Sequence, residues 1–227
     1  MLGNKKRVDK NPKIGVDMFH FAKLKEDPDK GNPSYEEPEQ IPGTVNVGFN
    51  QNASTAPFYA DNKVFRTSAQ RGNLVATIGL ADIPPDILSE WFGQAYKEGI
   101  LEEGQINPID MAFGYRVKKA NGAYRYFWFL KAKAAPPDES TETQGESLNY
   151  QTDSVELNCA YLASLGIFRR RADSDDPNLS DELKKDLESK WFSNPLWGRK
   201  EIGDDTGSDD TGSGDTGSGD TGTDPII

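Results

Sequence analysis

Apolar and polar residues alternate along several short segments of the chain, which is typical of β-strands that bury one face. The clearest segment is 44–49, where Val45, Val47 and Phe49 would lie on the same side. Comparable strands are predicted at 15–22, 62–67, 73–80, 110–117 and 155–161. The pattern therefore predicts a mainly β body.

A β-hairpin is predicted where residues 113–119 and 124–131 flank the dipeptide Asn121-Gly122. Asn-Gly readily adopts the positive φ angles of a two-residue hairpin turn. The second strand carries large side chains on both faces: Tyr124, Tyr126 and Trp128 on one, Arg125, Phe127 and Phe129 on the other. We expect such a strand to be buried between two layers, or between the sheet and a partner subunit.

Two segments show the spacing of amphipathic helices instead. Residues 84–93 begin with proline, are acidic in the early turns and end in glycine, with one stripe formed by Ile87, Leu88, Trp91 and Phe92. Residues 180–192 have Ser180 as a candidate N-cap and a narrower stripe, which suggests docking on a neighbour or a peripheral position. The predicted fold is a β-sandwich or barrel with one packed helix and a possible C-terminal helix.

Three stretches lack these patterns. Residues 1–12 are predicted to be a flexible N-terminal arm, and residues 25–40, rich in Pro, Gly, Asp and Glu, a long surface loop. Residues 203–227 contain an Asp-Thr-Gly-Ser repeat whose units have no apolar side chain, so we expect a disordered tail. The predicted folded domain is 13–202.

Charge is concentrated at one end of the chain. The net charge of the 227 residues is -11, and the last 25 residues hold seven aspartates and no lysine or arginine, which leaves -4 for the rest. A mildly acidic body disfavours a tight grip on nucleic acid, which depends on Lys and Arg clusters. No apolar run is long enough for a membrane helix, and no signal peptide is recognisable. We expect a soluble protein made in the cytoplasm.

Residues suited to catalysis or metal binding are scarce. His20 is the one histidine and lies between two phenylalanines, and the one cysteine, Cys159, lies in an apolar run. A catalytic triad or a multi-histidine metal site would have to be built around His20. The carboxylate pairs Glu102-Glu103 and Asp175-Asp176 are expected to be solvated surface charges. We therefore predict no enzymatic activity, no metal and no cofactor.

Several local patterns, in this order, resemble the major tail (tail tube) proteins of siphophages of Gram-positive bacteria. They are Gly15-Val16, Ile41-Pro42-Gly43-Thr44, Tyr59-Ala60-Asp61-Asn62 followed by Arg71-Gly72, the helical stretch 80–93, Ala112-Phe113-Gly114-Tyr115 and the aromatic stretch 122–128. The succession covers about residues 13–165. The pair formed by Tyr-Ala-Asp-Asn and the downstream helix is its most specific part.

The resemblance implies a β-sandwich subunit that forms hexameric rings, stacked into a tube through which DNA is ejected. It implies a place in the virion tail, with copies of itself, the tape measure, the tail terminator and distal tail proteins as partners, transient passage of DNA and no membrane. The segments 1–12 and 27–40 are candidate contacts between rings, since both are polar and expected to be unordered in a lone subunit. Candidate subunit-contact residues are Lys5, Lys6, Arg7, Tyr35, Tyr59, Asp61, Arg71, Tyr126 and Trp128.

An alternative from another class is a carbohydrate-binding or host-surface-binding β-sandwich of a phage tail tip. This alternative predicts an exposed aromatic platform, whereas the tube subunit predicts that the aromatic residues are buried in the sheet or at subunit contacts. A hydrolase is a more distant alternative, and it would need carboxylates gathered around His20 or in one cleft.

Overall fold

A large antiparallel sheet forms the body of the protein in the computed structural model, which describes residues 7–8, 10–52, 54–60, 62–70, 72–137, 142–143 and 150–199. The strands are β1 (Lys13–Glu26), β2 (Ser34–Tyr35), β3 (Glu39–Ile41), β4 (Thr44–Asn50), β5 (Ser54–Ala60), β6 (Lys63–Gln70), β7 (Leu74–Leu80), β8 (Ala95–Lys97), β9 (Ile100–Glu102), β10 (Met111–Lys119), β11 (Tyr124–Ala134), β12 (Asp153–Cys159) and β13 (Arg169–Asp173). The helices are α1 (Pro85–Phe92), α2 (Asp181–Lys190) and a short 3-10 helix, Trp191–Ser193. The predicted mainly β fold with two helices is confirmed.

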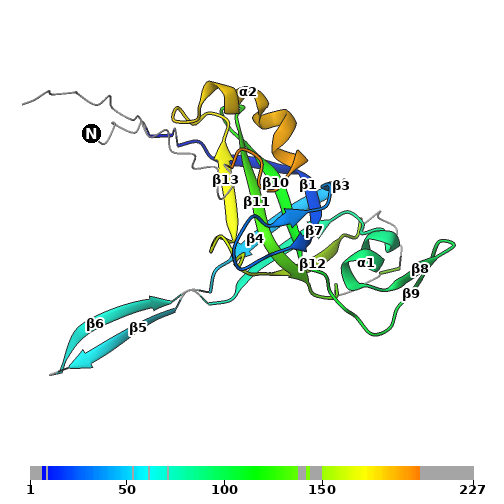
Figure 1. The fold of residues 1–227 in the computed structure, drawn as a ribbon, viewed down its shortest axis with the longest axis horizontal. Helices are drawn as coiled ribbons and strands as arrows, with labels where there is room; N and C mark the ends of the chain where they lie inside the picture. The colour runs from blue at the N-terminus through cyan, green and yellow to red at the C-terminus, as the bar shows by residue number, and fades with distance from the viewer. Residues whose placement is uncertain are drawn as a thin grey trace, which may run out of the picture.

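Strand β11 holds the two halves of the main sheet together. The strand order is β2-β1-β10-β11-β12-β7-β4, with β3 also pairing β1 and β13 also pairing β11. β13 pairs the first half of β11, and β12 pairs its last three residues, so the sheet divides along this strand. At the far end of the order, β4 lies against β1, and the sheet therefore curls back on itself (Figure 1).

The two faces of β11 contribute to two different hydrophobic cores. Phe127 and Phe129 lie in the core inside the curled sheet, which is extended by Ile87, Trp91 and Phe92 of α1. Tyr126, Trp128 and Leu130 lie in a second core between the opposite face of β11 and the α2 region. Of the two expectations for this strand, burial between two layers of the same chain is the one confirmed.

Both predicted helices form close to their expected bounds. α1 has proline in its first turn and ends at Gly93, whose φ of 63° is easily adopted by glycine. α2 is capped by Ser180, whose hydroxyl accepts a hydrogen bond from the Leu183 N–H at 3.3 Å. The chain then buries Trp191 and Phe192 against the sheet, so the C-terminal helical region docks on its own subunit.

Several elements depart from the expectations. The segment 25–40 is not only a loop, because it contains β2 and the start of β3. The basic run Arg169–Arg171, for which no strand was predicted, is part of β13 and pairs with β11. The short β8–β9 hairpin was not predicted. Residues 203–227 and most of 1–12 lie outside the described residues.

A hairpin made of β5 and β6 projects from the body (Figure 1). Its strands form a two-stranded sheet of their own, paired from Ser54 opposite Gln70 to Ala60 opposite Lys63, with a shift of register between Phe58 and Tyr59. It continues from β4 and β7, the paired strands of the main sheet that lead into and out of it. We call residues 54–70 the arm.

Candidate functional site

His20 is packed as a structural residue of β1. It is 7% exposed, its ring stacks on Phe192 at 4.3 Å between centroids, and Nδ1 lies 2.9 Å from the Met18 carbonyl oxygen. Burial lowers the pKa of His20, because an imidazolium would lose its hydration. Among the described residues, no three His, Cys, Asp or Glu side chains are grouped as metal ligands.

Cys159 is a partly buried free thiol at the end of β12 and packs against the inner core, as expected of a small core residue. Burial raises the pKa of its thiol to about 12, so the thiolate form is scarce at neutral pH. This environment is the opposite of that of a reactive cysteine.

The charged groups near the hairpin turn form an ion-pair cluster that corrects one prediction. Lys119 is 1% exposed, and its Nζ lies 3.1 Å from Asp173 and 2.5 Å from Asp175, while Arg125 also pairs with Asp173. Burial by itself would raise the pKa of both aspartates, but hydrogen bonds from Lys119 and its neighbours hold both pKa values below the ordinary range. Asp175 was expected to be a solvated surface charge, and it is instead a partner of a buried lysine.

Tyr126 and Trp128 were candidate subunit contacts, and the structure corrects this. Their side chains are 1% and 0% exposed inside the second core, and Trp128 Nε1 donates a hydrogen bond to the Trp191 carbonyl at 2.9 Å. The C-terminal helical region of the same chain covers them, so they cannot contact a neighbour as the subunit stands. Large aromatic residues indicate burial, but their pattern does not say which chain provides the cover.

The other candidate contacts are spread over the molecule. Arg7 is exposed, and Tyr35 is partly buried, donating its hydroxyl proton to the Leu130 carbonyl oxygen at 2.8 Å. Tyr59 lies in β5 of the arm. The remaining candidates, Lys5, Lys6, Asp61 and Arg71, lie outside the described residues.

The segment 27–40 is fastened to its own subunit, unlike the unordered loop expected. The Asp27 carboxylate accepts hydrogen bonds from Lys131 Nζ at 2.7 Å and from the Ala163 N–H at 3.0 Å. The Glu36 N–H also donates to the Lys23 carbonyl oxygen at 2.9 Å. A contact between rings through this segment stays a prediction.

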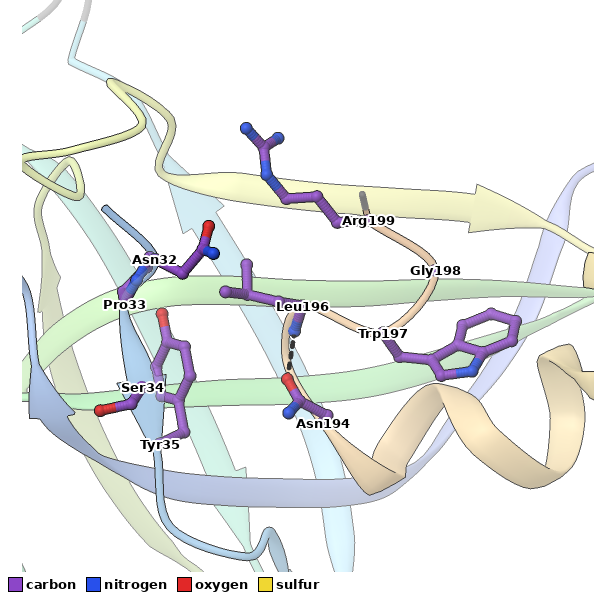
Figure 2. Close-up of a pocket in the computed structure, with 9 residues that line it drawn as sticks. All are labelled: Asn32, Pro33, Ser34, Tyr35, Asn194, Leu196, Trp197, Gly198 and Arg199. Atoms are coloured by element: carbon purple, nitrogen blue, oxygen red, sulfur yellow. Dashed lines mark hydrogen bonds between the residues drawn. The ribbon is translucent and has the colours of Figure 1, made fainter. Parts of the chain in front are cut away.

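A cavity of about 380 Å³ lies between this segment and the C-terminal part of the described chain (Figure 2). One wall carries Tyr35, and the other carries Leu196, Trp197 and Arg199. The second wall is held by the Arg170 guanidinium, which donates to the carbonyl oxygens of Pro195 and Trp197, both at 2.8 Å. Burial lowers the pKa of Arg170 to about 10. No carboxylate, thiol or imidazole lines the cavity, so these lining residues offer no acid-base pair for catalysis.

At the base of the arm, the two segments of the chain that enter and leave it lie in close contact. The Gly72 N–H donates to the Asn52 carbonyl oxygen at 3.2 Å, and Asn52 Nδ2 donates to the Asn73 carbonyl oxygen at 3.2 Å. A Cβ at Gly72 would lie 2.4 Å from the Asn52 carbonyl oxygen, and Asn52 itself has a φ of 39°. The chain therefore leaves the body through a tight crossing that favours glycine.

Half of the arm was predictable from the sequence. The strand expected at 62–67 is confirmed as part of β6, whereas β5 was missed because Pro57 and its small neighbours interrupt apolar alternation. The signal that could have found β5 is the Asp61-Asn62 step between the two strands, since Asn62 adopts a φ of 59°, as turn residues do.

Comparisons with known proteins are sparse. No protein-family model matches the chain, and no curated protein matches it. A solved structure described as the anti-feeding prophage cap (AFP tube terminating cap) aligns over 76% of this chain and 99% of that chain, with a TM-score of 0.43 and 12% identity. At that TM-score the likeness supports no conclusion about function.

Within the residues that the structure describes, no helix could cross a membrane. Neither α1 nor α2 is long and apolar enough for that role.

Proposed function

We propose that the protein is a structural subunit of a non-contractile phage tail tube, which assembles with copies of itself into stacked hexameric rings around a conduit for DNA. The observation that carries this proposal is the arm, a two-stranded hairpin that projects from a body whose own sheet is otherwise well covered (Figure 1). A separate two-stranded hairpin is only marginally stable in water. Packing against another chain would offset the conformational entropy that the hairpin loses when it becomes ordered.

The succession of motifs between residues 13 and 165 supports the same proposal. The Tyr59–Asn62 motif falls at the tip of the arm, at the end of β5, and the second part of the motif pair is α1. The two most specific parts of the resemblance therefore lie on separate features at the surface of the body.

The sugar-binding alternative has less support. It required the aromatic strand to present an exposed platform, but Tyr126, Phe127, Trp128 and Phe129 are all at most 4% exposed. Stacking on a sugar ring needs an accessible aromatic face, and these four side chains have none to offer.

Electron microscopy and sedimentation velocity of the purified protein at rising concentration test the proposal. We expect rings or tubes for the natural sequence. We expect a monomer at the same concentrations when residues 54–70 are replaced by a two-residue Asn-Gly turn, which closes a hairpin without the arm. Circular dichroism and thermal unfolding should show that the body of this variant still folds.

The proposal fails if the natural protein stays monomeric at every concentration. It also fails if the variant without the arm forms the same rings and tubes as the natural protein.

A further inference from the structure

Exposed apolar side chains gather at the end of the molecule formed by α1 and the β8–β9 hairpin. Tyr96 is 41% exposed, Ile100 65% and Ile106 40%, and these are three of the seven large hydrophobic residues that stand exposed in the described chain. The three lie within eleven consecutive residues, so this concentration is unlike the scattered exposure of a typical surface.

A cavity of about 360 Å³ lies in the same region. Five of its seven lining residues are apolar: Leu88 and Phe92 of α1, Ile106 and the pair Pro136-Pro137. Gln94 and Glu103 are its polar lining residues. The surface thus combines an apolar recess with projecting apolar side chains, as interface centres do. We call residues 82–106 the acceptor end.

The acceptor end is also strongly acidic. It contains six carboxylates and one lysine, a net charge of -5. Glu90 is already paired with Lys23 at 2.5 Å. Glu98, Glu102 and Glu103 are exposed, and within the described part of the chain none of them takes part in an ion pair.

The arm has the complementary charge. Residues 54–70 contain Lys63 and Arg66 against the single carboxylate of Asp61, a net charge of +1, and Arg71 follows directly in the sequence. Lys63 and Arg66 are exposed. Strands of seven and eight residues reach roughly 25 Å at the usual rise per residue, enough to extend beyond the subunit that carries them.

The arm and the acceptor end lie at opposite ends of the molecule (Figure 1). The arm of one subunit therefore cannot fold back onto its own acceptor end without dismantling the body. A contact between two different surfaces at opposite ends is heterologous, and it repeats from copy to copy into a ring or a filament.

We infer that the acceptor end, residues 82–106, is the docking surface for the basic arm of a second copy of this chain. The apolar recess and the exposed Tyr96, Ile100 and Ile106 supply buried area, and the glutamates select the arm by charge. The inference rests on the proposed self-assembly and specifies which two surfaces meet.

Reversing the charges tests the pairing. One variant carries Lys63→Glu and Arg66→Glu, which changes the net charge of the arm from +1 to -3. The other carries Glu98→Lys, Glu102→Lys and Glu103→Lys, which changes the acceptor end from -5 to +1. Each variant alone would bring like charges together at every contact, and we expect the concentration at which assembly begins to rise roughly tenfold or more.

An equimolar mixture of the two variants should assemble again. In the mixture the reversed arm can meet the reversed acceptor end, and the natural arm can meet the natural acceptor end, so every contact joins unlike charges. A control matched to the arm variant carries Lys118→Glu and Lys185→Glu. It makes the same change in net charge as that variant, on exposed residues elsewhere, and should assemble like the natural protein. Circular dichroism and thermal unfolding check that every variant folds.

Restoration in the mixture supports the inference, because no effect of net charge alone can produce it. If the natural protein forms tubes and both variants do so equally well alone, the acceptor end is wrong while self-assembly stands. A mixture that stays dispersed although both variants fold also overturns the inference. A natural protein that never assembles removes the proposed function itself.

Discussion

β11 and the arm are both built from β-strands, yet they are covered in opposite ways. One face of β11 packs into the curled sheet and the other packs under the C-terminal helical region, all within one chain. The arm pairs with itself and leaves the body (Figure 1). The body therefore buries its aromatic strand within one chain, whereas in the proposed assembly a second copy covers the arm. Changes in the two regions should separate folding from assembly.

The largest loss of stability is expected from Trp128→Ala. Trp128 is fully buried, contacts Phe192 and donates to the Trp191 carbonyl, so its removal leaves a large cavity and an unpaired carbonyl. We expect the free energy of unfolding to fall by about 3–5 kcal/mol. Urea titration followed by circular dichroism measures this.

Arg66→Ala is the matched change in the arm. It should alter the free energy of unfolding by less than about 0.5 kcal/mol, as expected of an exposed side chain. Equal losses for the two variants would show that the arm belongs to the cooperative body, and the contrast between the regions would disappear.

The next largest loss of stability is expected at the turn of the β10–β11 hairpin, where Lys119 is buried. Lys119→Met removes the cation that pairs with Asp173 and Asp175, and leaves two aspartates partly buried with fewer partners. Breaking a fully buried pair costs about 3–5 kcal/mol, and we expect a loss of about 2–3 kcal/mol here because Arg125 still pairs with Asp173. Lys185→Met on the exposed side of α2 should cost much less.

The same cluster predicts how stability depends on pH. The pKa values of Asp173 and Asp175 are lower in the folded protein than in the unfolded chain. Their contribution is therefore present above the ordinary aspartate range near pH 4, and it is lost as the pH falls through the lower folded values. Urea titrations between pH 6 and pH 2.5 should show this loss in the natural protein, and a weaker dependence in Lys119→Met. Identical pH profiles would exclude the cluster as the cause.

Much of the body was predictable because its signals are local. Val45, Val47 and Phe49 alternate, Asn121-Gly122 marks a turn, and Ser180 and Gly93 mark helix ends, and each of these acts within a few residues. β13 has no such signal. Arg169–Arg171 form a strand because they pair with β11. The Arg170 guanidinium donates hydrogen bonds to carbonyl groups about 25 residues later in the sequence.

The candidate site was less predictable for a related reason. The sequence showed that Tyr126 and Trp128 would be buried, but the cover comes from Trp191 and Phe192, more than 60 residues away. A pattern of apolar positions cannot distinguish cover from the same chain and cover from a second copy. The β8–β9 hairpin of the acceptor end was not predicted because its strands have only three residues each, too short for alternation to be visible.

A smaller loss is expected from the cap of α2, which covers the outer face of β11. Ser180→Ala removes the hydroxyl that accepts from the Leu183 N–H, and we expect the free energy of unfolding to fall by about 1 kcal/mol. Ser189→Ala, on an exposed site of the same helix, is the control and should change less. If both substitutions are silent, α2 contributes little to covering β11, and the body depends mainly on Trp191 and Phe192.

A small effect on body stability, and the sharpest test of the contrast between the two regions, is expected from Gly72→Ala. The new Cβ would lie 2.4 Å from the Asn52 carbonyl oxygen. The two segments of the chain that enter and leave the arm must therefore move apart at its base. The strain falls beyond the last paired residues of β4 and β7, Asn50 and Val75, and the free energy of unfolding should change by less than about 1 kcal/mol. The direction of the arm depends on this crossing, so sedimentation velocity should show assembly beginning at a clearly higher concentration than for the control Gly15→Ala, where a Cβ meets no neighbour within 4 Å. Normal assembly of Gly72→Ala would mean that the arm finds its partner whatever its angle at the base. A large loss of unfolding free energy would instead show that the crossing belongs to the cooperatively folded body. The boundary between body and arm would then lie farther along the arm than residue 54.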